Sequence, residues 1–305
     1  MNFAFKRRFR ALNLATRTAW RNRGRPRIPG PWVPGSQHPD SLLLITLDSC
    51  RFDTLSSCSV PVISGVGPIH KVMAPSYFTY ASHAAMFVGF TPGDGLSQEA
   101  IVNPKCGKLV RLHGGGSPSR ANDRFVLRGR SMMEGFNNAG YITAGTGAVK
   151  WFDDSSDVGR LLVQDFQHYM YAGNAWSLRK QLQWLSETVG GARRPVFAFI
   201  NIGETHVPYY YEGAPWSNAD VTCRAFASSN NAVESARRQA ACLTWVDQAI
   251  APLVAAFSKA NIMICGDHGD AWGEGGVWEH GFHHPKVMEV PMIFRVSDPT
   301  PSQAK

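Results

Sequence analysis

The first 39 residues of this 305-residue chain contain no acidic residue, and nine of its 31 Lys and Arg residues lie in positions 1–30. The other 22 basic residues face 23 acidic ones, so the formal charge of +8 falls to −1 without residues 1–30. A nearly neutral folded part does not attract a polyanion, so nucleic acid is not an expected partner. Residues 1–30 could instead contact an anionic membrane surface.

The sequence also lacks any run of about 20 apolar residues, the length that a membrane-spanning helix needs. No apolar stretch with a small-residue cleavage site stands near the start, so a signal peptide is not predicted. The six cysteines are scattered and form no C-x-x-C pair, which argues against a disulfide framework or a zinc ribbon. These absences favour a cytoplasmic protein that could also bind a membrane peripherally.

Hydrophobic residues make up 44% of the chain, enough to bury a large core. Pro and Gly crowd residues 24–39, which indicates a linker. We therefore expect a basic arm and linker over residues 1–36, one folded domain over 37–298 and a short tail over 299–305.

Within that domain, short apolar runs of strand length alternate with segments of helical periodicity. Strands are predicted at 42–47, 141–144, 195–202, 261–265 and 290–294. Helices are predicted at 131–139, 174–189 and 232–257, the last interrupted by Pro252. This alternation predicts an α/β fold, a three-layer αβα sandwich with a mostly parallel central sheet.

Three predicted strands end in residues that can bind a metal or transfer a proton. These residues are Asp48, Glu204, His206, Asp267 and His268. Ligands of open α/β sheets bind beyond the carboxyl ends of the strands, so we expect one shared site there. A carboxylate beside an imidazole suits zinc or manganese, and the glycines after His268 would allow close approach to a ligand. Alternatively, Asp48 only caps a helix and the glycines only form a turn.

Residues 74–89 are predicted to form a loop that enters a helix, with Thr79 near its first turn. A hydroxyl there faces unpaired N–H groups and the positive end of the helix dipole, which favour a bound phosphate. Thr79 could equally be the N-cap of that helix. The segment alone does not decide between the two.

Five segments resemble, in the same order, motifs of the sulfatase branch of the alkaline-phosphatase superfamily. They are LLLITLDSCRFDTL, APSYFTYASHAAMFVG, AGYITAGTG, NIGETHVPYY and CGDHGDAWGEGGVWEHG. The likeness runs from about Leu42 to Phe294, nearly the whole predicted domain. It implies an alkaline-phosphatase-like fold and a metal-dependent activity on phosphate or sulfate esters.

The resemblance also implies roles for single residues. The positions that match the family's metal-binding residues are Asp48, Thr79, Asp267 and His268. Thr79 also occupies the position of the nucleophile. His206 and His280 match residues that contact the transferred or leaving group, so catalytic and substrate-binding roles are expected for both. Arg51 matches a family pattern near the site and is a third candidate for substrate binding. The implied cofactor is a divalent ion, zinc or manganese before calcium or magnesium.

Thr79 sets this chain apart from the usual sulfatase pattern. Sulfatases carry C-x-P-S-R or S-x-P-S-R and oxidise its first residue to formylglycine, whereas the run here is TYASH at residues 79–83. Threonine cannot become that aldehyde, so no formylglycine is expected and sulfate hydrolysis by the usual route is disfavoured. Coordination to a metal is one way to activate a threonine hydroxyl as a nucleophile.

The leading hypothesis is a metal-dependent hydrolase or transferase of phosphate esters, a phosphatase or phosphodiesterase, with a covalent Thr79 intermediate. Its substrate would be a phosphorylated small molecule, lipid head group or glycan, with sulfated ones less favoured. One alternative is a non-catalytic sulfatase-like module that binds an anionic ligand or surface. The other is a sulfatase that uses unmodified Thr79. The complete set of implied ligands favours an enzyme over a binding module.

Overall fold

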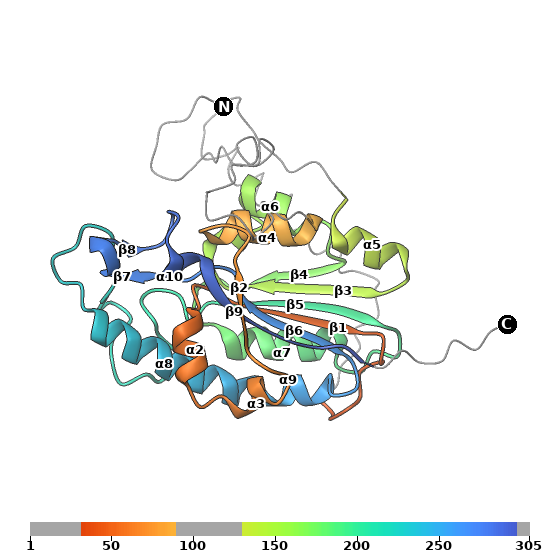
Figure 1. Cartoon of the computed structure of the whole chain (residues 1–305). Helices are drawn as coiled ribbons and strands as arrows, with labels where there is room; N and C mark the ends of the chain where they lie inside the picture. The colour runs from red at the N-terminus through yellow and green to blue at the C-terminus, as the bar shows by residue number, and fades with distance from the viewer. Residues whose placement is uncertain (1–31, 90–129, 298–305) are drawn as a thin grey trace, which may run out of the picture.

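Seven strands form the central sheet, in the order β2-β9-β6-β1-β5-β3-β4 (Figure 1). Their bounds are β1 Leu42–Leu47, β2 His70–Met73, β3 Ile142–Gly147, β4 His168–Tyr171, β5 Val196–Ile202, β6 Asn261–Gly266 and β9 Glu289–Arg295. The computed structural model describes residues 32–89 and 130–297. Strands β6, β1, β5, β3 and β4 pair in parallel, whereas β9 pairs antiparallel with β6 and with β2. The predicted mostly parallel sheet is confirmed.

Strand β1 lies at the centre of the sheet because both of its faces are apolar. Its alternate residues enter separate core clusters, with Ile45 in one and Leu44 in the other. A strand buried on both faces needs a continuous apolar run, which the sequence LLLITL supplies. The register places Leu47 beside Ile202 of β5 and Gly266 of β6. The segments that follow these three strands therefore leave the sheet at the same edge.

Helices cover both faces of the sheet and complete three layers (Figure 1). One face carries α4 Thr79–Val88, α5 Met132–Asn138 and α6 Asp157–Val163, with the 3₁₀ turn η2 Lys150–Phe152. The other carries α2 Phe52–Ser57, α3 Pro61–Ser64, α7 Leu178–Val189, α8 Ala232–Ala249 and α9 Ala251–Ala256. The predicted three-layer αβα sandwich is confirmed.

A small hairpin stands beyond the carboxyl edge of the sheet. It consists of β7 Ala271–Trp272, the 3₁₀ turn η3 Glu274–Gly276 and β8 Trp278–Glu279, and the short helix α10 Pro285–Met288 follows it. This hairpin contains the glycine-rich part of the sequence. It was not predicted as a pair of strands.

Several predicted boundaries shift in the structure. The helix predicted over 174–189 begins at Leu178, and Pro252 separates α8 from α9 as predicted, because proline fits only the first turn of a helix. The basic residues 1–30 and the tail 299–305 lie outside the described residues, so the domain boundaries stay a prediction. Within the described ranges, no helix is both long and apolar enough to cross a membrane.

Candidate metal centre and active site

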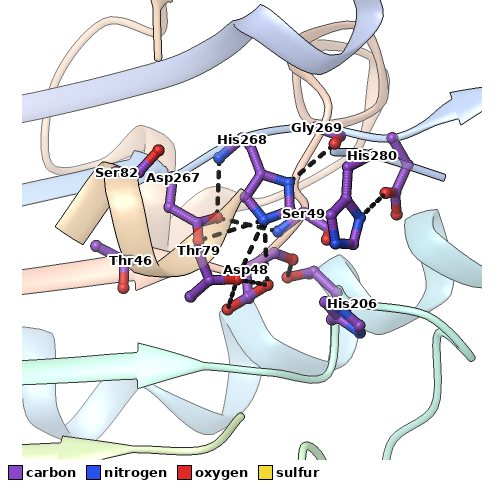
Figure 2. Close-up of polar contacts among 12 residues, drawn as sticks. Thr46, Asp48, Ser49, Thr79, Ser82, His206, Asp267, His268, Gly269 and His280 are labelled. Carbon is purple, nitrogen blue, oxygen red and sulfur yellow. Dashed lines mark hydrogen bonds and ion pairs between the residues drawn. The ribbon is translucent and has the colours of Figure 1, made fainter. Parts of the chain in front are cut away.

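The four predicted metal ligands come together at the carboxyl edge of the sheet (Figure 2). Asp48 follows β1, Asp267 and His268 follow β6, and Thr79 is the first residue of α4. Oγ1 of Thr79 lies 3.2 Å from Nε2 of His268 and 3.4 Å from the nearer carboxylate oxygen of Asp48. Nε2 of His268 lies 3.6 Å from Oδ2 of Asp267. All four side chains are buried, and their polar atoms lie close to one another.

The capping interpretations of Thr79 and Asp48 are wrong. The N-cap of α4 is Phe78, and no side-chain hydrogen bond caps that helix. Helix α2, the first after β1, has Arg51 as its N-cap. Both side chains are therefore left to face the cluster.

Hydrogen bonds from β5 and from the segments that follow β1 and β6 orient the two carboxyl groups. Oδ2 of Asp48 accepts from Nδ2 of Asn201, 3.0 Å away on β5. Oδ1 of Asp267 accepts from the backbone N–H groups of Ser49 and His268, at 3.1 and 2.9 Å. Ser49 has a φ of 58°, a left-handed conformation that costs a non-glycine residue free energy. That strained backbone aims its N–H at Asp267.

The donor atoms of this cluster fit a divalent cation. Nδ1 of His268 lies 3.0 Å from the carbonyl oxygen of Gly269, which can only accept, so the lone pair of this imidazole is on Nε2. Oδ2 of Asp267 is buried and has no hydrogen-bond donor in the described part of the chain. One ligand atom from each of Asp48, Asp267 and His268 falls within 4.8 Å of the others. One nitrogen with several oxygens is a set that suits zinc or manganese.

The charge of the cluster also favours a bound cation. Burial and the nearby charge of Asp48 raise the pKa of Asp267 well above its usual range. Burial lowers the pKa of His268 to about 3 and that of His83 to about 4, so both rings are neutral. Among the residues described, these two histidines are the only basic side chains within 4.0 Å of either carboxylate. Ionising both buried carboxyl groups would therefore bring two negative charges together without a compensating positive charge.

His206 and His280, the two predicted contacts of the transferred group, lie beside the cluster (Figure 2). The ring centroid of His280 is 4.3 Å from that of His268 and 5.3 Å from that of His206. Nδ1 of His280 lies 2.6 Å from Oδ1 of the buried Asp270. Burial alone would lower the pKa of His280, but the Asp270 carboxylate raises it above its usual value. The contact with Asp270 therefore favours a protonated His280 beside His268.

Arg51 lies near the site, but its guanidinium is occupied by protein acceptors. Nε and Nη2 donate to the carboxylate of Asp53 at 2.8 and 2.6 Å, and Nη1 donates to Glu274 at 2.7 Å. The group also stacks on Trp272, 4.1 Å from the ring centroid, and is only 4% exposed. These contacts tie the exit of β1 to the hairpin, which indicates a positioning role. Substrate binding by Arg51 stays a prediction without a contact to support it.

Three residues that support the site were not among the predicted site residues. Asn201 orients Asp48, and Asp270 holds His280. His83 joins α4 to β1, because its Nε2 lies 2.9 Å from Oγ1 of Thr46 and its Nδ1 lies 2.8 Å from the carbonyl oxygen of Thr79. A polar residue inside the apolar run of β5 was the one available signal for Asn201.

Glu204, grouped with the predicted site residues, instead serves a helix. It is buried, and its Oε1 accepts from the backbone N–H of Leu178 at the start of α7. Burial raises the pKa of Glu204 to about 8. Glu204 therefore has a different role from His206, which contacts His280.

The sulfatase family profile matches residues 126–305, more than half of the chain. No curated protein matches the sequence. Among solved structures, the C-terminal periplasmic domain of phosphoethanolamine transferase EptC from Campylobacter jejuni is similar, at 14% identity and a TM-score of 0.56. That match covers 85% of this chain and 80% of that chain.

The same domain of EptC from Escherichia coli, solved in complex with Zn, matches at 12% identity and a TM-score of 0.57, over 88% of this chain and 77% of that chain. The integral membrane protein lipooligosaccharide phosphoethanolamine transferase A from Neisseria meningitidis matches at 14% identity and a TM-score of 0.56. That match covers 95% of this chain and 54% of that protein, so this chain spans about half of that protein's length. At these identities the structural likeness shows a shared fold.

Proposed function

This chain belongs to the sulfatase family, in the alkaline-phosphatase superfamily, and we propose that it is a metal-dependent hydrolase or transferase of phosphate esters. The observation that carries this proposal is the position of the Thr79 hydroxyl. It does not cap its helix and lies 3.2 Å from His268 and 3.4 Å from Asp48. A nucleophile needs this kind of activated setting, because a threonine hydroxyl is weakly nucleophilic at neutral pH.

Asp48, Asp267 and His268, with Oγ1 of Thr79, would hold the cation. A bound divalent ion would lower the pKa of the threonine hydroxyl and offset negative charge on the ester oxygens. Zinc or manganese fits the mixed nitrogen and oxygen set better than calcium or magnesium. The orientation of Asp48 by Asn201 and of Asp267 by two backbone N–H groups holds the ligand atoms in place before the cation arrives.

In the first half of the reaction, Oγ1 of Thr79 forms a bond to phosphorus and its proton passes to solvent. The ester P–O bond breaks, and the departing oxygen keeps the electron pair of that bond. Nε2 of protonated His280 gives this oxygen a proton, so the leaving group departs as an alcohol. His206, whose ring centroid lies 5.3 Å from that of His280, would hydrogen-bond the transferred group.

In the second half, water or an acceptor alcohol attacks the phosphorus of the threonine ester. Neutral His280 takes the proton of the attacking oxygen, and Oγ1 of Thr79 leaves with the electron pair and regains a proton. The site uses the same groups for hydrolysis and for transfer, and only the attacking oxygen differs.

The test compares Thr79→Ala, Thr79→Ser and wild type on aryl phosphate mono- and diesters and aryl sulfates, with zinc or manganese. Thr79→Ala should lose phosphate-ester turnover by at least about a thousandfold, and Thr79→Ser should keep part of it. Thr143→Ala is the matched control, because Thr143 is buried near the opposite end of its strand and bonds Asn137. Mass spectrometry of the wild-type protein, quenched during turnover, should find a phosphoryl group on Thr79.

Full activity of Thr79→Ala would rule out the covalent intermediate. Arylsulfatase activity above phosphatase activity would instead support a sulfatase with unmodified Thr79. Tight binding of an anionic ligand with no turnover of any ester would support the non-catalytic module.

A further inference from the structure

His280 is held by a buried carboxylate that is not among the predicted ligands. Oδ1 of Asp270 lies 2.6 Å from Nδ1 of His280, and Asp270 is fully buried. A carboxylate can only accept a hydrogen bond, so the hydrogen lies on Nδ1. Nε2, on the other side of the ring, is then turned away from Asp270. The ring itself lies beside His268 and His206 (Figure 2).

We propose that Asp270 is a positioning residue that holds His280 in the orientation and tautomer from which Nε2 gives its proton to the leaving group. This inference rests on the proposed function and adds a residue that acts through His280. Asp270 would not touch the substrate.

The hairpin sets this contact through its register. Ala271 pairs with Glu279 and Trp272 pairs with Trp278 in the antiparallel ladder. Continuing this register by one residue places Asp270 opposite His280, and directly opposite residues project their side chains to the same face. The hairpin therefore builds the carboxylate–imidazole contact from backbone geometry.

A chain of donors fixes the second oxygen of Asp270. Nε1 of Trp272 donates to the hydroxyl of Tyr209 at 2.8 Å. Because an indole N–H cannot accept, that hydroxyl directs its own hydrogen to Oδ2 of Asp270, 2.7 Å away. Tyr209 is fully buried and adopts a left-handed φ of 55°. The carboxylate can therefore neither rotate nor exchange its two partners.

This chain of donors predicts what an isosteric amide would do. In Asp270→Asn, the amide oxygen keeps the hydrogen bond from Tyr209, so the NH₂ group faces Nδ1 of His280. Nδ1 must then accept a hydrogen bond and cannot carry a hydrogen. An imidazolium needs a hydrogen on both nitrogens, so His280 can no longer supply the proton that the leaving oxygen takes when the P–O bond breaks.

The experiment measures kcat/KM of wild type and Asp270→Asn, both loaded with zinc, on phosphate esters with good (4-nitrophenyl) and poor (alkyl) leaving groups. This ratio reports the first half of the reaction, whereas kcat also includes the second half, in which His280 acts as a base on the same threonine ester for both substrates. A general acid contributes about 10²–10⁴-fold, and only a poor leaving group needs it in full. We expect kcat/KM to fall at least about 100-fold for the alkyl ester and less than about 10-fold for the nitrophenyl ester. The zinc content should stay unchanged.

Two controls separate positioning from a general structural role. In a His280→Gln background, Asp270→Asn should cause no further loss, because the group through which it acts is already gone. Tyr209→Phe keeps Asp270 and should cause a smaller loss with the same dependence on the leaving group.

An equal loss of kcat/KM for both esters, or a further loss in the His280→Gln background, would overturn the proposal. So would two zinc ions per wild-type chain with one lost in Asp270→Asn, because Asp270 would then be a ligand together with His268 and His280.

A second measurement does not depend on turnover. Nitrogen-15 NMR of the metal-free protein should show an Nδ1–H resonance that disappears in both His280→Gln and Asp270→Asn. If wild type turns over no ester, the proposed function fails, and this resonance still decides whether Asp270 holds the tautomer. Absence of the resonance from wild type would overturn the positioning role.

Discussion

The Asp267→Asn substitution tests the metal centre without any substrate. Oδ1 of Asp267 accepts from two backbone N–H groups, so the amide oxygen of asparagine should occupy that position. The NH₂ group then replaces Oδ2, which is buried without a donor in the described part of the chain. It removes a buried carboxyl group that is costly to ionise beside Asp48 and presents a donor to the carboxylate of Asp48. Without metal, the variant should therefore be more stable than wild type.

The expected size follows from the buried oxygen. A buried acceptor without a partner costs about 1–3 kcal/mol, so the variant should gain about 2 kcal/mol in the free energy of unfolding. For a chain of this length that corresponds to a rise of about 3 °C in Tm. Zinc at a thousandfold excess over its Kd stabilises a binding protein by about 4 kcal/mol. Because the variant has lost a ligand, wild type should become the more stable of the two by about 2 kcal/mol when zinc is added.

The pH dependence of the free energy of unfolding should also differ between metal-free wild type and Asp267→Asn. The pKa of Asp267 is raised in the folded protein by burial and by Asp48, so folding favours its protonated form. The stability that this group contributes is fully present below the usual range of aspartate and is lost as pH rises through the raised pKa. Metal-free wild type should therefore lose more stability than Asp267→Asn when the pH is raised from 5 to 8.

Thermal and urea unfolding in chelator and in zinc would measure these differences. Asp247→Asn is the matched control, because Asp247 is also buried and its carboxylate accepts from the N–H groups of Val62 and Ile63. It should destabilise the protein equally with and without zinc. The reasoning would be refuted if Asp267→Asn were less stable than wild type in chelator. It would also be refuted if zinc stabilised the variant as much as it stabilises wild type.

Two further predictions concern residues around the centre. Glu204→Gln should reduce the loss of Tm between pH 6 and 9. Burial raises the pKa of Glu204 to about 8. The contribution of Glu204 to stability is therefore fully present below its usual pKa of 4.5 and is lost as pH rises through 8. The exposed Glu212→Gln should leave the slope unchanged, and an unchanged slope in Glu204→Gln itself would contradict this pKa. Gly269→Ala should lower stability by about 1–3 kcal/mol and weaken zinc binding. The Cβ of the new alanine would lie 2.3 Å from the carbonyl oxygen of Lys286, and this clash would displace the loop that carries His268. Calorimetric zinc titration and urea unfolding would check this, and Gly135→Ala in α5, whose Cβ meets nothing within 4 Å, should be neutral or stabilising.

The sequence could predict which strands end in ligands, because the signals are local. An apolar run of strand length followed at once by Asp48 or by Asp267 and His268 indicates a strand and its exit. Parallel pairing then brings the exits to one edge whatever the order of the strands. The position of Thr79 was left open between a cap and a nucleophile, and the structure decides its geometry through the neighbouring Phe78, which takes the N-cap position.

The supporting hydrogen bonds could not be predicted in the same way. Asn201 reaches Asp48 only because β5 lies directly beside β1 in a register that pairs Thr46 with Asn201. The order of strands in a sheet depends on how all the layers pack, and no local pattern near Asn201 specifies it. His83 likewise meets Thr46 because α4 packs over β1, across 37 residues of sequence.

The contact between Asp270 and His280 is an intermediate case, because its signal was present and its interpretation was left open. The glycines between them were expected to allow close approach to a ligand or, alternatively, only to form a turn. In the structure Gly273, Gly275 and Gly276 have φ values of 97°, 63° and 80°, and they turn the chain between β7 and β8. A hairpin whose turn centres on Gly275 pairs residues whose numbers add to 550, as the observed pairs 271 with 279 and 272 with 278 do. The ten-residue spacing from Asp270 to His280 fits that turn, so reading the glycines as a hairpin would have paired the carboxylate with the imidazole from sequence alone.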